Sequence, residues 1–498
     1  MAPIVGWLED AVRGMTRTRV VFALAGLTFV VTLNGMARRR RRRRRGGKKG
    51  TEGEEQEKRK GRAAMDLSLR SMDLTKPALS YLDVFLEALG NQWTPSMNKE
   101  EGYICLLIAE NKLTTSLVSK RFKQVKTVPD SVFAYTSFRG EPRFRQAVAN
   151  YVEMTFCPQA RIDPENLAIS SGCGAVIENV CFSVCEAGEE VLIPSPYYPA
   201  FDNDLRVRSR VLPVPVLCST ATFPLPSNED LDKAFAACRS PRILLLTNPH
   251  NPLGVVLEPE EVMRCVKWAL QRGMHVVSDE IYANSVHGAA DGAEFKSVIA
   301  MMPELSGMLG KELIEERVHT IFGFSKDFCA SGLRIGCLHT KNLRLLAAID
   351  NVGYFGGVSG HTAHIMTEVL EDKSFVKKFV QKNQENLRKS YNTLVSKLKE
   401  ADIGFLPAGA GMFLWIDLRK YLSERSWEAE KTLWTGLAKD AKVLFTPGKD
   451  CHAKAPGFFR VCFAWVPEQA LVIAVDRIVR HLRKNQLDIP MLKNLLAE

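Results

Sequence analysis

The chain has 498 residues, of which 46% are hydrophobic and 25% charged, and this composition excludes a protein that is disordered throughout. The net charge of +11 comes from 67 Lys and Arg against 56 Asp and Glu. Residues 1–62 hold 17 of the basic and 6 of the acidic residues, so the other 436 residues carry 50 of each sign. The excess charge therefore belongs to an N-terminal tail and gives no argument for nucleic-acid binding by the rest of the chain.

The tail, residues 1–64, combines an apolar segment with an arginine-rich one. Residues 20–33, "VVFALAGLTFVVTL", are uncharged and extend to Ala37 only if Asn34 and Gly35 are included, which is short for the roughly 20 residues of a membrane-spanning helix. Eight consecutive arginines follow at 38–45. Three interpretations stay open: a disordered leader, a single-pass anchor with the rest of the chain on the cytosolic side, or contact of the arginines with anionic lipid or nucleic acid.

Twelve cysteines are spread singly between Cys105 and Cys462. No CxxC pair is present, and no His and Cys residues have the short spacing that a zinc site needs. We therefore expect reduced thiols in a cytoplasmic compartment and no metal site.

From about residue 65 short apolar runs alternate with stretches of helical period, which is typical of an α/β fold with a mostly parallel sheet covered by helices. The expected strands are 191–193, 243–247, 275–278 and 319–324. A helix is predicted to begin at Pro259 and to end at Gly273, with Val262, Cys265, Val266 and Ala269 on its apolar face. Past residue 345 the pattern changes to charged helical stretches. We predict a large domain over 115–345 and a smaller α+β domain made of 65–114 and 346–498.

Polar motifs follow the predicted strands, at the edge where open α/β sheets hold their ligands. "SSGCGA" at 170–175 precedes a helix and could seat a phosphate on bare backbone N–H groups, although such turns are also glycine-rich for steric reasons alone. In "SDEIY", Asp279 and Glu280 end an apolar strand, and a carboxylate turned inward there needs a cationic partner. "TNPHNPLG" is a rigid turn that can aim Asn251 inward.

Lys326 follows the strand at 319–324, in "SKDFCASGLR". A lysine at a strand end in a partly dry cleft has a lowered pKa and can act as a Schiff-base nucleophile. Taken by itself, the residue is better explained as a solvated lysine. The ordered series of all these motifs is what favours a functional site.

This series resembles the fold-type I pyridoxal-phosphate enzymes of the aspartate aminotransferase superfamily. The resemblance is closer to the 1-aminocyclopropane-1-carboxylate (ACC) synthase family, including its animal synthase-like branch, and it covers about residues 95–480. It rests on "GYICLLIAENKL", "RGEPRFRQAVANYV", "VLIPSPYYPAFDNDLRVR", "TNPHNPLG", "SDEIYANSV", "SKDFCASGLRIG" and "PGKDCHAKAPGFFRVCFA". It implies the cofactor pyridoxal 5'-phosphate, an α-amino acid substrate and a homodimer with a shared active site.

The resemblance also implies a role for each matching residue. Lys326 would form the Schiff base with the cofactor and move the substrate's α-proton, and Asp279 would keep the pyridine nitrogen protonated. The remaining cofactor contacts would come from Asn251, Tyr282, Tyr198, Arg334, Ser325 and the backbone amides of Cys173 and Gly174. Arg460 would bind the substrate carboxylate with two parallel hydrogen bonds, and Glu110 would lie near the substrate.

Two positions depart from the synthase pattern. The family has a tyrosine that reaches the partner subunit's cofactor phosphate where this chain has Phe138, and a serine where this chain has Gly323. Each loss removes a hydroxyl donor worth about 1.5–3 kcal/mol to a charged acceptor. We expect cofactor binding to survive and the reaction with S-adenosylmethionine to be affected.

Three functions therefore remain in view. The first is an ACC synthase-like lyase. The second is an aminotransferase or β-eliminating lyase of the same fold. The third is a membrane-tethered or RNA-associated protein that keeps the fold without turnover.

Overall fold

The computed structural model describes residues 67–75, 79, 81–218, 225–288 and 294–495. The chain divides into two compact units, Met1–Thr75 and Lys76–Glu498, and each is described by itself. The described part of the first unit is helix α4 (Leu69–Met72) followed by the 3-10 turn η1 (Asp73–Thr75). The apolar run at 20–37 and the arginines at 38–45 lie outside the described residues. Among those that are described, no helix is both long and apolar enough to cross a bilayer.

A seven-stranded sheet forms the centre of the second unit, in the order β2-β8-β7-β6-β5-β3-β4. Strand β8 runs antiparallel to β2 and β7, and the other neighbouring pairs are parallel. This confirms the mostly parallel sheet predicted from the sequence. The strands are β2 (Leu167–Ser170), β3 (Glu190–Ser195), β4 (Leu212–Leu217), β5 (Pro241–Thr247), β6 (His275–Asp279), β7 (Val318–Gly323) and β8 (Gly336–Thr340).

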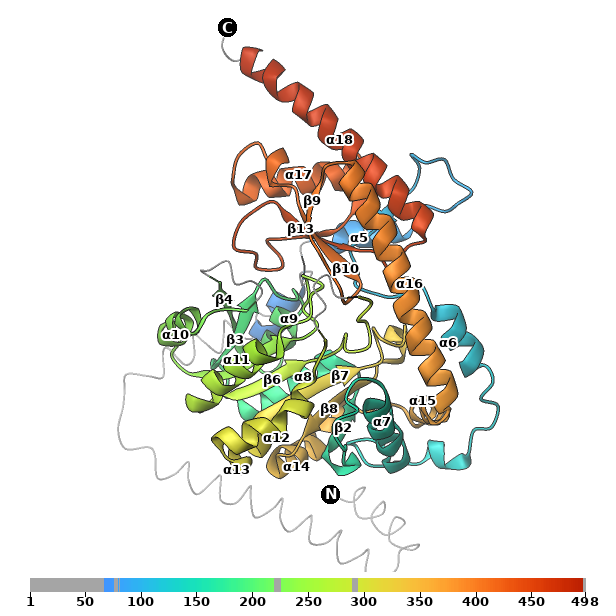
Figure 1. Ribbon diagram of the computed structural model, residues 1–498, viewed down its shortest axis with the longest axis vertical. Helices are drawn as coiled ribbons and strands as arrows, with labels where there is room; N and C mark the ends of the chain where they lie inside the picture. Colours follow the sequence, from blue (N-terminus) through green and yellow to red (C-terminus); the bar gives the residue numbers. More distant parts are fainter. Residues whose placement is uncertain (1–66, 76–78, 80, 219–224, 289–293, 496–498) are drawn as a thin grey trace, which may run out of the picture. The chain divides into compact units, whose positions relative to one another are not determined.

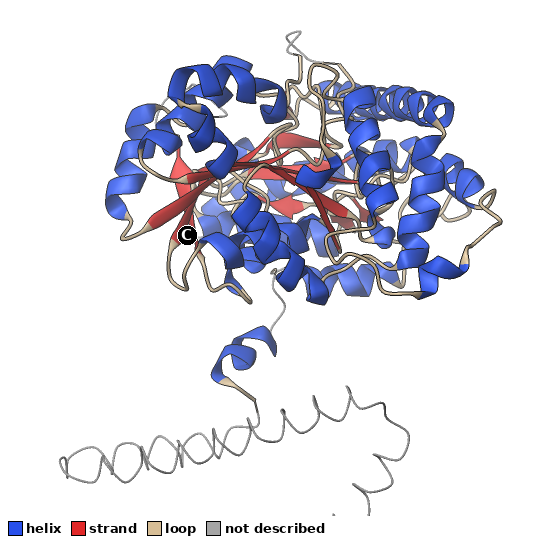
Figure 2. Ribbon diagram, turned by 90° about the horizontal axis from the view of Figure 1, so that it is seen from below, coloured by secondary structure: helices blue, strands red, loops and turns tan. Residues whose placement is uncertain are grey.

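Helices cover both faces of this sheet (Figures 1 and 2). The helices that connect or flank its strands are α6 (Thr115–Phe122), α7 (Pro142–Thr155), α8 (Cys173–Val184), α9 (Phe201–Arg206), α10 (Asn228–Ala237), α11 (Pro259–Gln271), α12 (Val298–Leu309), α13 (Lys311–Arg317), α14 (Leu343–Val352) and α15 (Gly360–Glu371). Short 3-10 turns lie at Asp130–Phe133, Pro164–Asn166, Ser331–Leu333, Gly353–Phe355 and Arg419–Tyr421.

The central strands are buried on both faces, which explains why they appear in the sequence as unbroken apolar runs. Residues 243–247 of β5 and all of β6 are buried. Helix α11 begins at Pro259 as predicted, because a proline at the first helical position loses no hydrogen bond. Its face of Val262, Cys265, Val266 and Ala269 is buried against the sheet.

A second, antiparallel sheet has the order β12-β13-β10-β9. A separate parallel pair, β1 with β11, joins residues near position 104 to residues near 443. The strands are β1 (Ile104–Cys105), β9 (Gly404–Leu406), β10 (Phe413–Asp417), β11 (Val443–Leu444), β12 (Thr446–Pro447) and β13 (Phe458–Cys462). The accompanying helices are α5 (Leu82–Leu89), α16 (Lys373–Glu400), α17 (Trp427–Lys439) and α18 (Glu468–Leu495). Helix α16 contacts both α7 and β9, so it runs beside both sheets (Figure 1).

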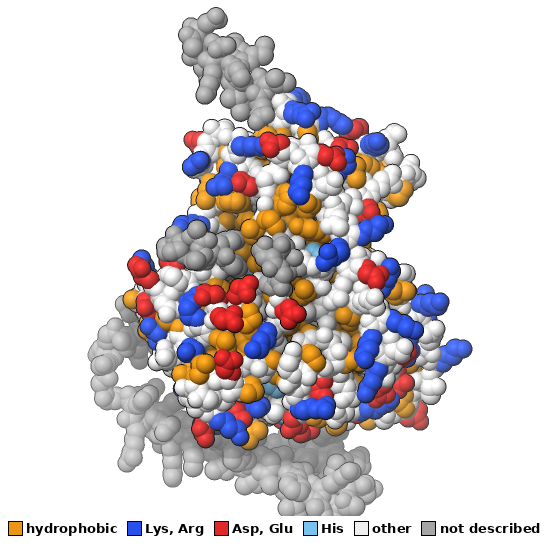
Figure 3. Space-filling view, viewed as in Figure 1, with side chains coloured by type: hydrophobic (Ala, Val, Ile, Leu, Met, Phe, Trp, Pro, Cys, Tyr) orange, Lys and Arg blue, Asp and Glu red, His pale blue; other side chains and the backbone are white. Residues whose placement is uncertain are grey.

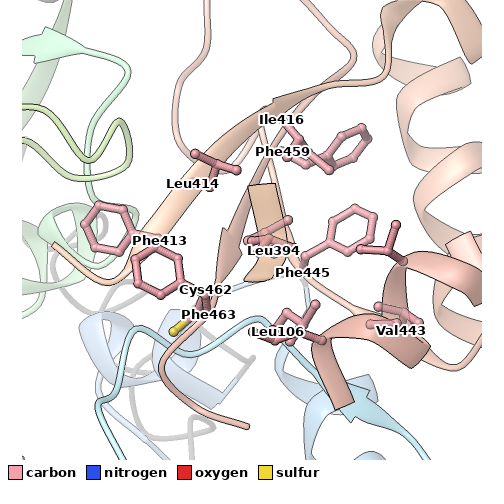
Figure 4. Packing of buried hydrophobic residues seen from close by; sticks show 14 of the residues in the cluster. Leu106, Leu394, Phe413, Leu414, Ile416, Val443, Phe445, Phe459, Cys462 and Phe463 are labelled. Atoms are coloured by element: carbon pink, nitrogen blue, oxygen red, sulfur yellow. The ribbon is translucent and has the colours of Figure 1, made fainter. Parts of the chain in front are cut away.

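A hydrophobic cluster lies under the four-stranded sheet (Figure 4). It combines Leu106 from the N-terminal segment with Leu394 of α16 and with Phe445 and Phe459 from the C-terminal strands. Burying these apolar groups holds segments together that lie more than 300 residues apart in the chain. The domain boundaries within the second unit remain a prediction.

The surface of the second unit mixes acidic and basic side chains over the face shown in Figure 3. This mixture matches the equal numbers of the two signs outside the tail.

The loop between β12 and β13 is held by one buried carboxylate, that of Glu430. Its two oxygens accept hydrogen bonds from the backbone N–H groups of Lys449 (2.9 Å) and Gly457 (2.6 Å). Glu430→Ala should leave both donors unpaired and lower the free energy of unfolding by about 2–4 kcal/mol. Chemical unfolding measures this loss, with Lys431→Ala, an exposed neighbour on the same helix, as the control. A Glu430→Ala protein as stable as the control would contradict the assignment.

Candidate active site

A cavity of about 180 Å³ opens at the carboxyl edge of the seven-stranded sheet. It contains groups able to act as nucleophile, acid, base and anion receptor. Its walls are Cys173, Gly174, Ile177, Tyr198, Phe201, Asp204, Thr247, Asn251, Asp279, Ile281, Tyr282, Ser325, Lys326, Ser331 and Arg334. The structure thus brings together nine of the eleven residues predicted from the sequence. The other two contact residues of the wall: Arg460 bonds to Asn251, and Glu110 bonds to Ser331.

Strand register explains why distant motifs meet here. Thr247 at the end of β5 pairs with Asp279 at the end of β6, and Gly323 ends β7 at the same edge. Because β8 is antiparallel, its first residue, Gly336, lies at this edge beside Gly323. The residues just before β8 therefore reach the same cavity as those that follow the parallel strands.

Lys326 lies three residues beyond the end of β7. Its Nζ donates a hydrogen bond to the carbonyl oxygen of Ala109 at 2.6 Å, and among the described residues no carboxylate lies within ion-pairing distance of it. Burial, and next the positive charge of Arg460, lower the pKa of the Lys326 amine. The amine is therefore easier to deprotonate than an exposed lysine, as a nucleophile requires.

Asp279 is almost fully buried, and burial raises the pKa of its carboxyl to about 7. One oxygen accepts a hydrogen bond from the backbone N–H of Ile281 at 3.2 Å, and no cation of the described chain forms an ion pair with it. Nearby, the Asn251 amide donates to the Tyr282 hydroxyl at 3.4 Å. Burial raises the pKa of the Tyr198 hydroxyl to about 12, so this ring presents a neutral aromatic wall.

The other end of the cavity is formed by the start of α8 and by Arg334. Gly172, which precedes α8, has φ of +93°, and a Cβ there would lie 2.5 Å from the Arg334 guanidinium. Glycine therefore lets the arginine approach the helix N-terminus, where the backbone N–H groups are unpaired. A guanidinium beside a positive helix end is an anion receptor suited to a phosphate.

Arg460 extends from β13 and is almost fully buried. Its guanidinium donates to Asn251 Oδ1 at 3.0 Å, to the Leu107 carbonyl oxygen at 2.8 Å and to Thr446 Oγ1 at 3.0 Å. Its Nε has no hydrogen-bond partner among the described residues. A buried donor left unpaired is costly, and a ligand carboxylate would satisfy it.

Glu110 lies behind the cavity wall, whereas Ser325 is part of the wall. Glu110 accepts a hydrogen bond from the Ser331 hydroxyl, and Ser331 is itself part of the wall. Ser325 is buried in the wall next to Lys326.

Two ionisable residues at or near the site, one in the wall and one beside Arg460, were not predicted from the sequence. Asp204 on α9 lies in the wall, 3.1 Å from where a Cβ of Gly174 would be, and burial raises the pKa of its carboxyl to about 7. Tyr81 is buried just before α5, and burial raises the pKa of its hydroxyl, which lies in the field of Arg460. A single tyrosine before a short helix gives no sequence signal, whereas Asp204 belongs to a motif, "YYPAFDND", that the sequence had already marked.

The loop between β12 and β13 contacts the segment that follows β3. His452 Nε2 lies 3.0 Å from Asp202 Oδ2, and the His452 ring stacks on Tyr197 with centroids 4.2 Å apart. The Ser195 hydroxyl donates to the His452 carbonyl oxygen. These contacts join the loop that leads into Arg460 to the segment that carries Tyr198.

The two departures from the synthase pattern lie in different surroundings. A Cβ at Gly323 would lie 2.7 Å from the Ile335 carbonyl oxygen and 3.0 Å from Cys173 Sγ, so a side chain has no room there. Phe138 is partly exposed and packs edge-on against Tyr354 with centroids 5.1 Å apart. It does not line the cavity of its own chain.

The residues fit pyridoxal 5'-phosphate in three independent respects. Among the residues that the structure describes, Lys326 provides an amine without a carboxylate partner and Asp279 a buried carboxyl without a cation, and Arg334 provides an anion receptor at a helix N-terminus. All twelve cysteines are free thiols. Within the described residues no three His, Cys, Asp or Glu side chains form a metal-binding group.

Comparison with known proteins agrees with this geometry. Residues 105–478 match the family "Aminotransferase class I and II". The chain is 31% identical over 414 residues to 1-aminocyclopropane-1-carboxylate synthase 11 of Arabidopsis thaliana, covering 80% of this chain and 88% of that protein. It is 32% identical over 390 residues to the 1-aminocyclopropane-1-carboxylate synthase of Malus domestica, covering 77% and 81% of the two chains.

Solved structures share the fold. An aspartate aminotransferase double mutant of Thermus thermophilus superimposes with a TM-score of 0.66 at 21% identity, covering 84% of this chain and all of that one. An aromatic aminotransferase of Pyrococcus horikoshii superimposes with a TM-score of 0.64 at 19% identity, covering 77% and 97%. The chain belongs to the aminotransferase class I and II family and, within it, is ACC synthase-like.

Proposed function

We propose that this protein is a pyridoxal 5'-phosphate-dependent enzyme that acts on an α-amino acid, with ACC synthase-like lyase chemistry on S-adenosylmethionine as the leading activity. The observation that carries the proposal is the single cavity in which Lys326, Asp279, Tyr282 and Arg334 meet. The similarity to ACC synthases over 76–80% of the chain in several relatives supports the substrate class.

Each residue has one task in this proposal. When bound, pyridoxal phosphate supplies an electron-withdrawing ring that makes the substrate's α C–H acidic. Lys326 Nζ, with its lowered pKa, takes the α-proton and returns it. Asp279 keeps the ring nitrogen protonated. The protonated ring is then the cationic partner that a buried carboxylate needs. Arg334 and the start of α8 hold the phosphate.

Arg460 binds the substrate carboxylate through the Nε that has no partner in the described chain. The guanidinium is already oriented by Asn251, Leu107 and Thr446. Orientation before binding reduces the entropy lost when the substrate arrives.

An aminotransferase activity is the second candidate. It uses the same residues and differs in where the proton returns after it leaves the α-carbon. The structural similarity to aspartate and aromatic aminotransferases shows that the fold accommodates such enzymes. The absent hydroxyls at Phe138 and Gly323 also favour an altered reaction.

A fold retained without turnover is disfavoured, because all of the groups that the chemistry needs are present around one cavity. The N-terminal tail and its membrane, lipid or nucleic-acid contacts remain predictions.

We also propose that the active form is a homodimer. An aromatic group, defined here as Phe133, Tyr135, Phe138, Tyr354 and Phe355, is exposed in the single chain and joined in part by edge-on ring contacts. Exposed aromatic clusters mark interaction sites. Its residues adjoin the phosphate end of the cavity, since Gly356 O accepts a hydrogen bond from the Ser171 N–H at 2.7 Å.

The cofactor assignment is tested by the visible absorbance band of lysine-bound pyridoxal phosphate. The full chain incubated with the cofactor should show the band, and Lys326→Ala should lose it, because no other amine lies in the cavity wall. Lys341→Ala, an exposed lysine after β8, is the matched control and should keep the band. A band of undiminished intensity in Lys326→Ala would refute the role of this lysine.

Product analysis distinguishes the two reactions. With S-adenosylmethionine, the loaded protein should release ACC and methylthioadenosine, and Arg460→Gln should reduce kcat/KM by about 10–100-fold because the charged hydrogen bond from Nε to the substrate carboxylate is lost. Lys454→Gln, in the loop that precedes β13 and outside the cavity, provides the control. Release of a keto acid from an amino acid, without ACC, would decide for the aminotransferase.

Restoring the synthase serine should not restore tighter cofactor binding. In Gly323→Ser the new Cβ would overlap the Ile335 carbonyl, and such overpacking costs about 1–3 kcal/mol. We expect lower stability and weaker binding of the cofactor, measured by thermal unfolding and equilibrium dialysis. Gly323→Ala separates the effect of volume from that of the hydroxyl, and tighter binding in Gly323→Ser alone would contradict this account.

A further inference from the structure

A second cavity lies at the opposite edge of the seven-stranded sheet, where β5, β6 and β7 begin. Its volume is about 710 Å³, and it shares no residue with the active site. Its wall is built from the end of α8, the first residues of β5 and β6, the end of α13 and the start of α14. The proposed reaction uses none of these residues.

Two arginines in this wall lack carboxylate partners. Arg242 uses Nε on the Val184 carbonyl oxygen at 2.9 Å, and Arg317 uses Nη1 on the Gly273 carbonyl oxygen. No acidic side chain in the described parts of the chain lies within ion-pairing distance of either guanidinium. A guanidinium has five N–H donors, so each arginine keeps donors available to a ligand.

The glutamates of the wall do not neutralise this pair. Glu189 accepts hydrogen bonds from the Ser240 hydroxyl and from the backbone N–H of Glu186. Glu316 lies 3.5 Å from the exposed Arg344, a third arginine of the wall. Glu186 is exposed. These carboxylates thus bond to groups other than Arg242 and Arg317 or are exposed to solvent.

A buried histidine adds a directed donor. His275 is about nine-tenths buried, lines the cavity, and stacks on His319 with its Nδ1 3.0 Å from His319 Nε2. Its remaining polar atom, Nε2, has no hydrogen-bond partner among the described residues and is not enclosed by the protein. Burial first, and then the charges of Arg317 and Arg242, lower its pKa to about 4. The ring is therefore neutral at pH 7.

The hydrogen-bond network is compatible with the tautomer of the His275 ring that donates from Nε2. Thr340 Oγ1 already accepts the Asn342 N–H at 3.1 Å, so its own hydrogen can be donated to His319 Nδ1, 2.8 Å away. His319 Nε2 then carries a hydrogen and donates it to His275 Nδ1. Under this assignment His275 Nε2 carries its N–H toward the cavity.

We propose that this cavity binds the phosphate group of a small phosphorylated molecule between Arg242, Arg317 and His275. Two guanidiniums and a neutral N–H donor match the several acceptor oxygens of a phosphate. The start of α14 adds the positive end of a helix at the same wall. Phe182, which is partly exposed in the wall, offers an apolar face to the organic part of the ligand.

The test uses full-length protein loaded with pyridoxal phosphate, so that the phosphate receptor at Arg334 is occupied. Isothermal titration calorimetry at constant ionic strength measures the binding of inorganic pyrophosphate and of adenosine monophosphate. We expect saturable binding of both to the wild type, with the visible cofactor band unchanged. In Arg242→Gln/Arg317→Gln the affinity should fall at least about tenfold, since each charged hydrogen bond is worth 1.5–3 kcal/mol.

The control variant is Arg425→Gln, which changes an exposed arginine outside the cavity and should bind like the wild type. Thermal unfolding without ligand and the cofactor band establish that the double variant is folded. Unchanged pyrophosphate affinity in a folded double variant would overturn the proposal. Absence of saturable binding of both phosphates to the wild type would overturn it as well.

Discussion

The close approach of three backbone segments at the carboxyl edge of the large sheet is the constraint on which the site depends. Gly336 pairs with Ser170 of β2 on one side and with Gly323 of β7 on the other. A Cβ on Gly336 would overlap the backbone of Gly172. Side chains are excluded from this region, so the start of α8, the Lys326 segment and Arg334 can surround one small cavity.

This close approach also explains why position 323 is a glycine. In the sequence it counts as the loss of a hydroxyl that the synthases possess. In the structure it is a place where the Ile335 carbonyl and the Cys173 thiol have taken the space that a side chain would need. The glycine is thus required by the local packing, to which Cys173 contributes.

The sequence was sufficient to predict the parts of the fold and site that follow from local patterns. Apolar runs identified β3, β5, β6 and β7, Pro259 identified the start of α11, and the polar residues after the strands identified Lys326, Asp279 and Asn251. The predicted strands and the start of α11 are confirmed. Lys326, Asp279 and Asn251 lie around one cavity because strand ends in a parallel sheet meet at one edge, and their roles remain predictions. Family resemblance, and not local pattern, was needed for Arg460 and Glu110.

Other features could not be predicted because they depend on contacts distant in sequence. The pairing of β1 with β11 involves two residues on each side, too few for a periodic signal. Tyr81 lies close enough for the positive charge of Arg460 to act on its hydroxyl, and this proximity depends on contacts distant in sequence. The stacked histidines His275 and His319 appear in the sequence as ordinary residues at the starts of two strands, and only the pairing of β6 with β7 makes them neighbours.

The position of Arg460 near the end of the chain has a consequence for how the protein is made. Chains emerge from the ribosome with the N-terminus first, so Lys326, Asp279 and Arg334 are available for folding more than 120 residues before Arg460. The loop that carries Arg460 into place docks on Ser195 and Asp202, which are synthesised much earlier. During synthesis the groups proposed to hold the cofactor are therefore present before the group proposed to hold the substrate. Strand β13 adds that group, Arg460, after the others.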